Sequence, residues 1–244
     1  MAQASPVVVA ANSAEPVAPL WHTVVFLAMF LALAVANALR IQHASAALPH
    51  RLRVYIFSIL FEWVMVAYVW WFGLRPRGMR VRELIGGKWA RVSDFFRDVG
   101  IAFLFWLVVL SMLATIRLVL GPNPAAVKAI RLLAPRTGAE MIVWVLVSVT
   151  AGITEEFLFR GYLQRQFLAL TKSPHVAVVL QAIVFGSAHI YQGWKGAVGI
   201  TFYGALFGVL ALVRRSLRPG MMQHATQDTV SGIAVSLLSK HGYM

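Results

Sequence analysis

The sequence predicts an all-α fold, a polytopic membrane bundle of about seven to eight transmembrane helices around an intramembrane polar cavity. Of the 244 residues, 59% are hydrophobic and 13% are charged, and the mean hydropathy is +0.73. Soluble domains carry about 25% charged residues. The apolar residues also gather in runs close to the roughly 20 residues that a spanning helix needs. An ordinary soluble domain is therefore excluded.

The apolar runs predict where the helices lie. The fourth run is too long for one ordinary span, so we expect it to tilt or to leave the membrane at its Arg160–Arg165 end. Pro174 and Pro219 stand at the start of later runs, where proline favours the first turn of a helix. The runs cover about residues 22–39, 54–73, 99–120, 141–170, 175–193, 197–213 and 221–238.

We expect a single membrane domain with three parts. Residues 1–19 contain no Lys or Arg and lack the basic start of a signal peptide, which predicts a flexible tail. Residues 20–139 hold the first transmembrane helices and a basic segment at 81–98, which is expected to form an interfacial helix. Residues 140–244 form the core that carries the polar clusters described below.

Basic residues dominate the charge, with 22 Lys and Arg against 9 Asp and Glu and a net charge of +13. They lie mostly between apolar runs, which predicts loops beside anionic lipid rather than a nucleic-acid partner. The segment 74–98 and the loop 214–218 are the most basic, so both are expected on the cytoplasmic side. The sequence has no cysteine, which excludes disulfides, thiolate metal sites and cysteine nucleophiles.

Three polar clusters interrupt the apolar runs. They are Glu155-Glu156 with Arg160, the stretch Phe185–His189, and the stretch His224–Asp228. Each charged side chain within a membrane costs roughly 2.5–3.5 kcal/mol on insertion scales and usually faces a bundle interior or a wet cavity. We therefore expect the three clusters to converge on one site.

Helical geometry separates the two glutamates. Four residues along a helix give a rotation of about 40°, so Arg160 is expected to pair with Glu156. Glu155 is about 140° away from Arg160 and should remain free to exchange protons with water in a cavity. His224 and Asp228 are also four residues apart, so Asp228 either orients His224 or acts with it on a substrate.

No serine, threonine or lysine has the surroundings of a nucleophile. The available chemistry is Glu and His activating a water while other polar groups hold the oxyanion, which is hydrolysis without a covalent intermediate. Glu62 and Arg117 lie within apolar runs without a local partner, and they are expected to pair across helices or to snorkel. The tryptophans, Trp144 among them, are interpreted as anchors at the membrane interface.

The motifs resemble those of a known family. "EEFLFR" matches EExxxR, "FGSAH" matches FxxxH, and "HATQD" matches HxxxN/D, in this order on successive apolar runs. These are signatures of the CPBP family, also called Abi or CAAX protease and bacteriocin-processing proteins, which includes the Rce1-type CAAX prenyl endopeptidases. The resemblance covers roughly residues 140–238.

The resemblance implies a glutamic-type intramembrane endopeptidase that needs no cofactor, with a cavity open to the cytoplasmic side. By analogy Glu155 and His189 would activate the water, and His224 with residue 228 would stabilise the oxyanion. Supporting roles would fall to Glu156, Arg160 and Phe185. Position 228 is Asp here, where CAAX-processing members carry Asn; an Asp donates a hydrogen bond only when it is protonated.

The predicted function is hydrolysis of a peptide bond near the C-terminus or membrane border of a lipidated, tagged or small peptide substrate. The expected partners are that substrate and membrane lipids, and the expected location is a bacterial plasma membrane. One alternative is a zinc peptidase with His189, His224 and a Glu as ligands. Another is a non-catalytic membrane scaffold or immunity protein that holds a partner in the same cavity.

Overall fold

The computed structural model describes residues 15–44 and 50–240, and within these ranges the chain is helical with no β-strand. Each of the seven apolar runs coincides with a long helical element. These elements are α1 (Leu20–His43), α2 (Arg51–Tyr68), α4 (Val92–Leu120), α6 (Gly138–Glu156), α8 (Pro174–Ala188), α9 (Gly193–Arg214) and α10 (Arg218–Lys240). The predicted all-α class is confirmed.

Shorter helical pieces join or extend the long helices. Two of them are π-helical, with i→i+5 hydrogen bonds, and they continue α2 and α6. The pieces are η1 (Val69–Leu74, π), η2 (Arg75–Arg77), α3 (Val81–Ile85), α5 (Pro124–Leu133), η3 (Phe157–Leu163, π), α7 (Gln164–Thr171) and η4 (Ile190–Gln192). The chain from Gly138 to Thr171 is thus one long helical element with a π-helix inside it.

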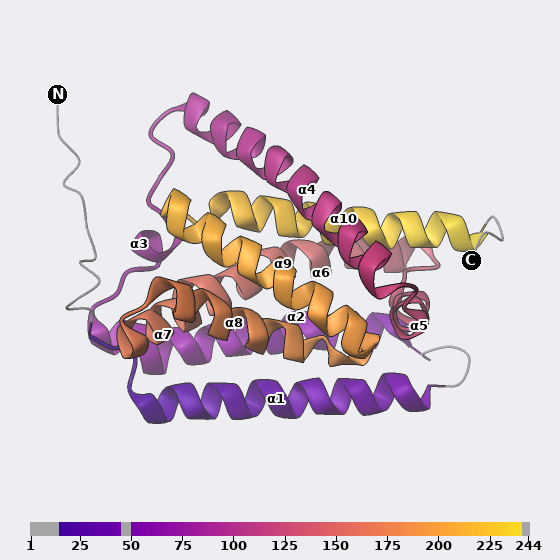
Figure 1. Ribbon diagram of the computed structural model, residues 1–244, viewed down its shortest axis with the longest axis horizontal. Helices are drawn as coiled ribbons and strands as arrows, with labels where there is room; N and C mark the ends of the chain where they lie inside the picture. Colours follow the sequence, from indigo (N-terminus) through magenta and orange to yellow (C-terminus); the bar gives the residue numbers. More distant parts are fainter. Residues whose placement is uncertain (1–14, 45–49, 241–244) are drawn as a thin grey trace.

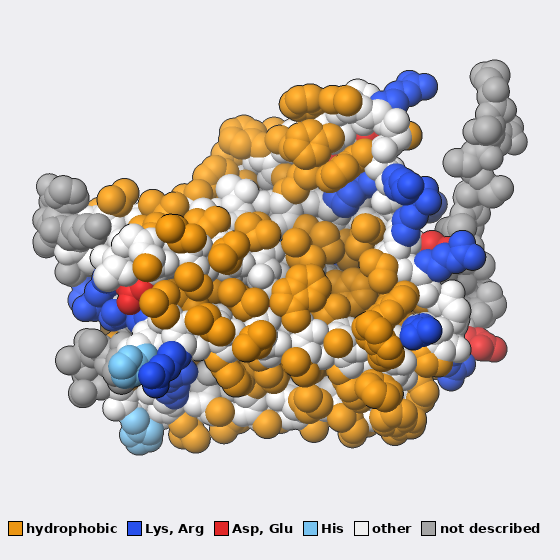
Figure 2. All heavy atoms as spheres, turned by 180° about the vertical axis from the view of Figure 1, so that it is seen from behind, with side chains coloured by type: hydrophobic (Ala, Val, Ile, Leu, Met, Phe, Trp, Pro, Cys, Tyr) orange, Lys and Arg blue, Asp and Glu red, His pale blue; other side chains and the backbone are white. Residues whose placement is uncertain are grey.

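The helices make this an integral multi-pass membrane protein. Five stretches are long and apolar enough to cross a bilayer: Leu20–His43, Arg51–Arg77, Val92–Leu120, Gly138–Thr171 and Ile190–Arg214. Of the remaining two long helices, α8 is apolar but has 15 residues, and α10 has 23 residues and carries the third polar cluster. Hydrophobic side chains cover the middle of the face in Figure 2, and Lys and Arg gather at its two ends.

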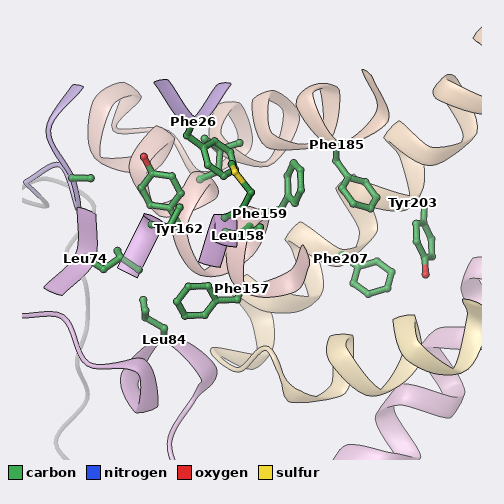
Figure 3. Close-up of a cluster of buried hydrophobic side chains, with 14 of the residues drawn as sticks. Phe26, Leu74, Leu84, Phe157, Leu158, Phe159, Tyr162, Phe185, Tyr203 and Phe207 are labelled. Atoms are coloured by element: carbon green, nitrogen blue, oxygen red, sulfur yellow. The ribbon is translucent and has the colours of Figure 1, made fainter. Parts of the chain in front are cut away.

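The core element α6 packs between α2 and α10, while α8 packs against α9 and α7. Helix α4 crosses α9 and α10 obliquely at the edge of the bundle (Figure 1). The aromatic side chains of η3 itself are buried: Figure 3 shows Phe157, Phe159 and Tyr162, with Phe26 of α1 packed against them. This packing fixes the helix directly after Glu155 and Glu156.

The basic segment 81–98 is not the single interfacial helix that the sequence predicts. Helix α3 ends at Ile85, and α4 begins at Val92. Gly86 and Gly87 between them have φ values of +95° and +84°, in the left-handed region where glycine carries no steric penalty. These two glycines break the helix and turn the chain.

The two basic regions lie at the same end of the bundle. Asp98, which is fully buried, pairs with Arg218 at 3.0 Å and with Arg214 at 3.5 Å. A Cβ on Gly86 would also meet the Cβ of Ser216 in the loop between α9 and α10. The segment 74–98 and the loop 214–218 are therefore held together, as expected for loops on one side of a membrane.

Of the predicted tail at 1–19, residues 1–14 lie outside the described part of the chain. Just before α1, the backbone N–H of Ala18 donates to Gln166 Oε1 at 3.1 Å, and its carbonyl accepts from Gln166 Nε2 at 2.9 Å. The residues that lead into α1 therefore belong to the packed bundle and not to a flexible tail.

Candidate active site

A close contact between α6 and α10 brings the first and third polar clusters together. A Cβ on Gly152 would lie 2.8 Å from both the Ala225 nitrogen and the Met221 oxygen, which is too close for any side chain. The two backbones approach here because glycine has no side chain. One turn further along α6, Glu155 and Glu156 consequently face His224.

Glu156 forms the buried ion pair that the sequence predicts. Its Oε1 accepts from Arg160 Nη1 at 2.9 Å, and both side chains are at most 2% exposed. The guanidinium also donates to the Gly204 carbonyl at 3.1 Å and lies over the rings of Phe185 and Phe207, 4.6 Å and 4.9 Å from their centroids. The ion pair thus ties η3 to α8 and α9.

Glu156 also orients His224, a contact that the sequence did not predict. His224 Nδ1 lies 3.2 Å from Glu156 Oε1, the same atom that pairs with Arg160. Because a carboxylate only accepts, Nδ1 carries a hydrogen. Asp228 lies instead at the other ring nitrogen, with its Oδ2 3.7 Å from Nε2, which is too long for a direct hydrogen bond.

Glu155 points away from Arg160, as the helix angles predict. Its Oε2 lies 3.7 Å from His224 Nε2, and this oxygen is buried without a hydrogen-bond donor among the described residues. Buried polar atoms nearly always have a partner, and exceptions concentrate where a ligand or reactant binds. Glu155 Oε2 is therefore available to a bound water or substrate.

His189 ends α8 and turns its ring into the same region. Its Nδ1 lies 2.9 Å from the Phe185 carbonyl. A carbonyl only accepts, so Nδ1 carries the hydrogen and Nε2 keeps its lone pair. Phe185 supports both histidines, since its ring centroid lies 5.0 Å from that of His189 and 6.1 Å from that of His224.

One cavity of about 260 Å³ joins these groups. The side chains of Glu155, His189, His224 and Asp228 all line it, so the structure brings the predicted residues of three helices into a single site. Their chemical roles remain predictions. The rest of the lining is mainly apolar and aromatic, from Leu113, Ile130, Leu133, Ala134, Trp144, Phe185, Tyr191, Ile200 and Tyr203.

Two residues were assigned no role in the site from the sequence. Trp144, interpreted as an interface anchor, donates from Nε1 to the Asp228 carbonyl at 3.0 Å and lines the cavity. Glu62 contacts Thr154, the residue before Glu155, with 2.6 Å between Oε2 and Oγ1. For Glu62, the available signal in the sequence is a charge inside the second apolar run. For Trp144 the sequence holds no such signal, because its contact depends on how α6 and α10 pack.

The cavity lies toward α5 and η4, at the end of the bundle opposite to α3 (Figure 1). Two predictions from the sequence therefore conflict, namely a cavity that opens to the cytoplasm and a basic segment 74–98 on the cytoplasmic side. If the cavity opens to the cytoplasm at the α5 end, the segment 74–98 lies on the opposite side of the membrane. The α5 end is basic too, which weakens the charge argument; its Lys and Arg residues include Arg40, Arg51, Arg53, Lys128, Arg131 and Arg136.

In the described part of the chain, no three His, Asp or Glu side chains are grouped so that they could hold a metal ion. The ligand set named for the zinc alternative, His189 with His224 and a Glu, is thus not brought together as a metal site in this structure.

Residues 137–230 match the family model described as type II CAAX prenyl endopeptidase Rce1-like. The match runs from the start of α6 into α10 and leaves α1 to α5 outside. Neither the curated proteins nor the solved structures gave a match to the chain. The matched segment includes Glu155, Glu156, Arg160, Phe185, His189, His224 and Asp228.

Proposed function

We propose that this chain, which over residues 137–230 belongs to the Rce1-like family of CAAX-type membrane proteases, is a glutamic-type intramembrane endopeptidase. The observation that carries the proposal is Glu155 Oε2, a buried carboxylate oxygen without a donor, in a cavity that it shares with two differently oriented histidines. A general base needs such an atom within reach of a water and of the substrate carbonyl.

In the proposed reaction, Glu155 and the lone pair of His189 Nε2 hold the attacking water. Glu155 takes a proton from the water while the oxygen of the water adds to the carbonyl carbon of the scissile bond. The carbonyl oxygen becomes the oxyanion of a tetrahedral intermediate. The proton then passes from Glu155 to the leaving nitrogen as the C–N bond breaks, which gives a carboxylic acid and a free amine; the acid then releases its proton to become a carboxylate.

His224 is the proposed oxyanion donor. With hydrogens on both ring nitrogens, it donates from Nδ1 to Glu156 and from Nε2 toward the cavity. The buried Glu156–Arg160 pair supports this role because Glu156 Oε1, held by Arg160, accepts the hydrogen of Nδ1 and so leaves Nε2 for the cavity. A protonated Asp228 would supply a second donor beside Nε2. Removing one oxyanion donor typically lowers kcat by about 10²–10³-fold.

The proposed substrate is a peptide cleaved near its C-terminus or at the membrane border. The cavity's aliphatic and aromatic lining suits apolar side chains or a lipid chain next to the scissile bond. We place the protein in a bacterial plasma membrane with the cavity reaching the cytoplasmic side, and membrane lipids as its surroundings. Under this proposal α5 is cytoplasmic.

The test uses the full chain in detergent with a farnesylated, internally quenched CAAX peptide and its unprenylated twin. We expect cleavage of at least one peptide, and a loss of about 10²-fold or more in Glu155→Gln. Glu83→Gln is the matched control, since Glu83 is an exposed carboxylate on α3. Full activity of purified Glu155→Gln would end the assignment of the base.

Two further outcomes separate the alternatives. Activity that survives chelators in a metal-free preparation contradicts the zinc peptidase, whereas loss on chelation and recovery with zinc supports it. If no peptide is cleaved, comparing protein C-termini in cells that carry the parent or Glu155→Gln tests the wider class of natural substrates. Identical C-termini in both would favour the scaffold.

A further inference from the structure

Glu62 contacts the residue before the proposed base from a helix outside the segment that matches the family. It lies on α2, which packs along α6. Its Oε2 is 2.6 Å from Thr154 Oγ1, and Thr154 is fully buried. Because Thr154 directly precedes Glu155, this contact holds the turn of α6 that carries the proposed base.

Counting hydrogens at Thr154 indicates the state of Glu62. Thr154 Oγ1 also lies 2.8 Å from the Thr150 carbonyl. A hydroxyl has one hydrogen to donate, and a backbone carbonyl can only accept. Both contacts are ordinary two-centre hydrogen bonds only if Thr154 donates to Thr150 and a protonated Glu62 donates to Thr154; with an ionised Glu62 the two oxygens would share one hydrogen.

The carboxyl group of Glu155 favours the same state. Glu62 interacts electrostatically with Glu155 on α6 and with His224 and Asp228 on α10. Glu155 would repel a negative charge on Glu62 in this low-dielectric region, and Asp228 would add repulsion when ionised, whereas a protonated His224 acts in the opposite direction. A neutral acid keeps the hydrogen bond to Thr154 and adds no charge beside the base.

We propose that Glu62 is a protonated carboxylic acid that positions Thr154, and through it Glu155, so that α2 forms part of the active site. Glu62 is a positioning residue and takes no part in bond making or breaking. The positioning role rests on the proposed function, whereas the protonated state does not.

The protonated state is tested by infrared spectroscopy of the purified full chain at neutral pH. We expect the parent to show the carbonyl stretch of the Glu62 carboxylic acid, and we expect this band in the difference spectrum between the parent and Glu62→Gln, in which any band of a protonated Asp228 cancels. The band should persist in the exposed control Glu83→Gln and in Glu155→Gln. A difference between parent and Glu62→Gln that contains only carboxylate bands would overturn the proposal.

The positioning role is tested by comparing two replacements of Glu62. Gln is neutral, has nearly the same shape and can donate to Thr154, whereas Ala leaves the hydroxyl unsupported. With the farnesylated peptide, Glu62→Gln should be at least about tenfold more active than Glu62→Ala. Equal losses in both, with Tm values like the parent's, would show that an ionised carboxylate is required and would refute the role.

The two proposals fail separately. If the parent cleaves no peptide, the proposed function is in question, but the infrared band still decides whether Glu62 is protonated. If Glu62→Ala does not fold, Thr154→Val removes the same contact from the other side. Under the proposal, Thr154→Val lowers activity while the acid band of Glu62 remains or shifts; unchanged activity in a folded Thr154→Val would contradict it.

Discussion

Glu156→Gln should destabilise the protein far more than the same replacement of a glutamate in an exposed ion pair. The substitution removes the charge that neutralises Arg160, and the side chains of the pair are 2% and 0% exposed. Breaking a buried pair by removing one partner costs about 3–5 kcal/mol. The amide oxygen of Gln can still accept one hydrogen bond from Arg160, so the lower part of this range is expected.

The expected fall in Tm follows from the size of the chain. For proteins of 150–250 residues, 1 kcal/mol corresponds to about 2–4 °C, so a loss of about 3 kcal/mol lowers the Tm by about 6–12 °C. The assay is the fraction of full-length protein that remains monomeric on size-exclusion chromatography after heating in detergent.

Glu83→Gln provides the matched control, because Glu83 pairs with Arg80 at 3.9 Å with both side chains largely exposed. Exposed pairs contribute about 0–1 kcal/mol, so this variant should stay within about 4 °C of the parent. Equal Tm values for Glu156→Gln and Glu83→Gln would refute the view that the buried pair stabilises the bundle.

The remaining predictions concern packing, the oxyanion site and orientation. Gly152→Ala should lower the Tm because its Cβ would press on α10, whereas Gly100→Ala on the open face of α4 should raise it by removing a helix glycine; similar shifts would contradict the close approach. Asp228→Asn should keep activity within about tenfold, and a loss beyond about 10²-fold at every pH would refute the donor role. In cells, Lys128→Cys should be protected from a membrane-impermeant thiol reagent, whereas Arg82→Cys should be labelled; neither chain has another cysteine. The reverse pattern would place the cavity end of the bundle on the side opposite to the cytoplasm.

The sequence allowed prediction of features that depend on spacing along one helix. Apolar runs located the long helices, and the four-residue interval predicted the Glu156–Arg160 pair. The same rotation correctly turned Glu155 away from Arg160. These predictions succeed because the periodicity of a helix fixes which side chains share a face.

Contacts between helices were beyond the same reasoning. Nothing in the spacing places His224 Nδ1 on Glu156 rather than on Asp228, since that choice depends on how closely α10 approaches α6 at Gly152. The link between Glu62 and Thr154 joins residues 92 positions apart. The break in the segment 81–98 is the exception: Gly86-Gly87 is a local signal for it, and two glycines in the left-handed region outweigh the amphipathic pattern around them.

The π-helix η3 has a consequence for where the chain beyond it docks. A π-helix holds one more residue than the α-helix it replaces, and it absorbs that residue so that the following side chains keep their direction. If η3 took α geometry at its present length, everything beyond it would turn by about 100°, the rotation of one residue. Gln164 would then lose the Gly208 carbonyl, and Gln166 would lose Ala18, while the two carboxylates before η3 would keep their places. The π geometry of η3 thus sets where the first helix docks, independently of the chemistry one turn upstream.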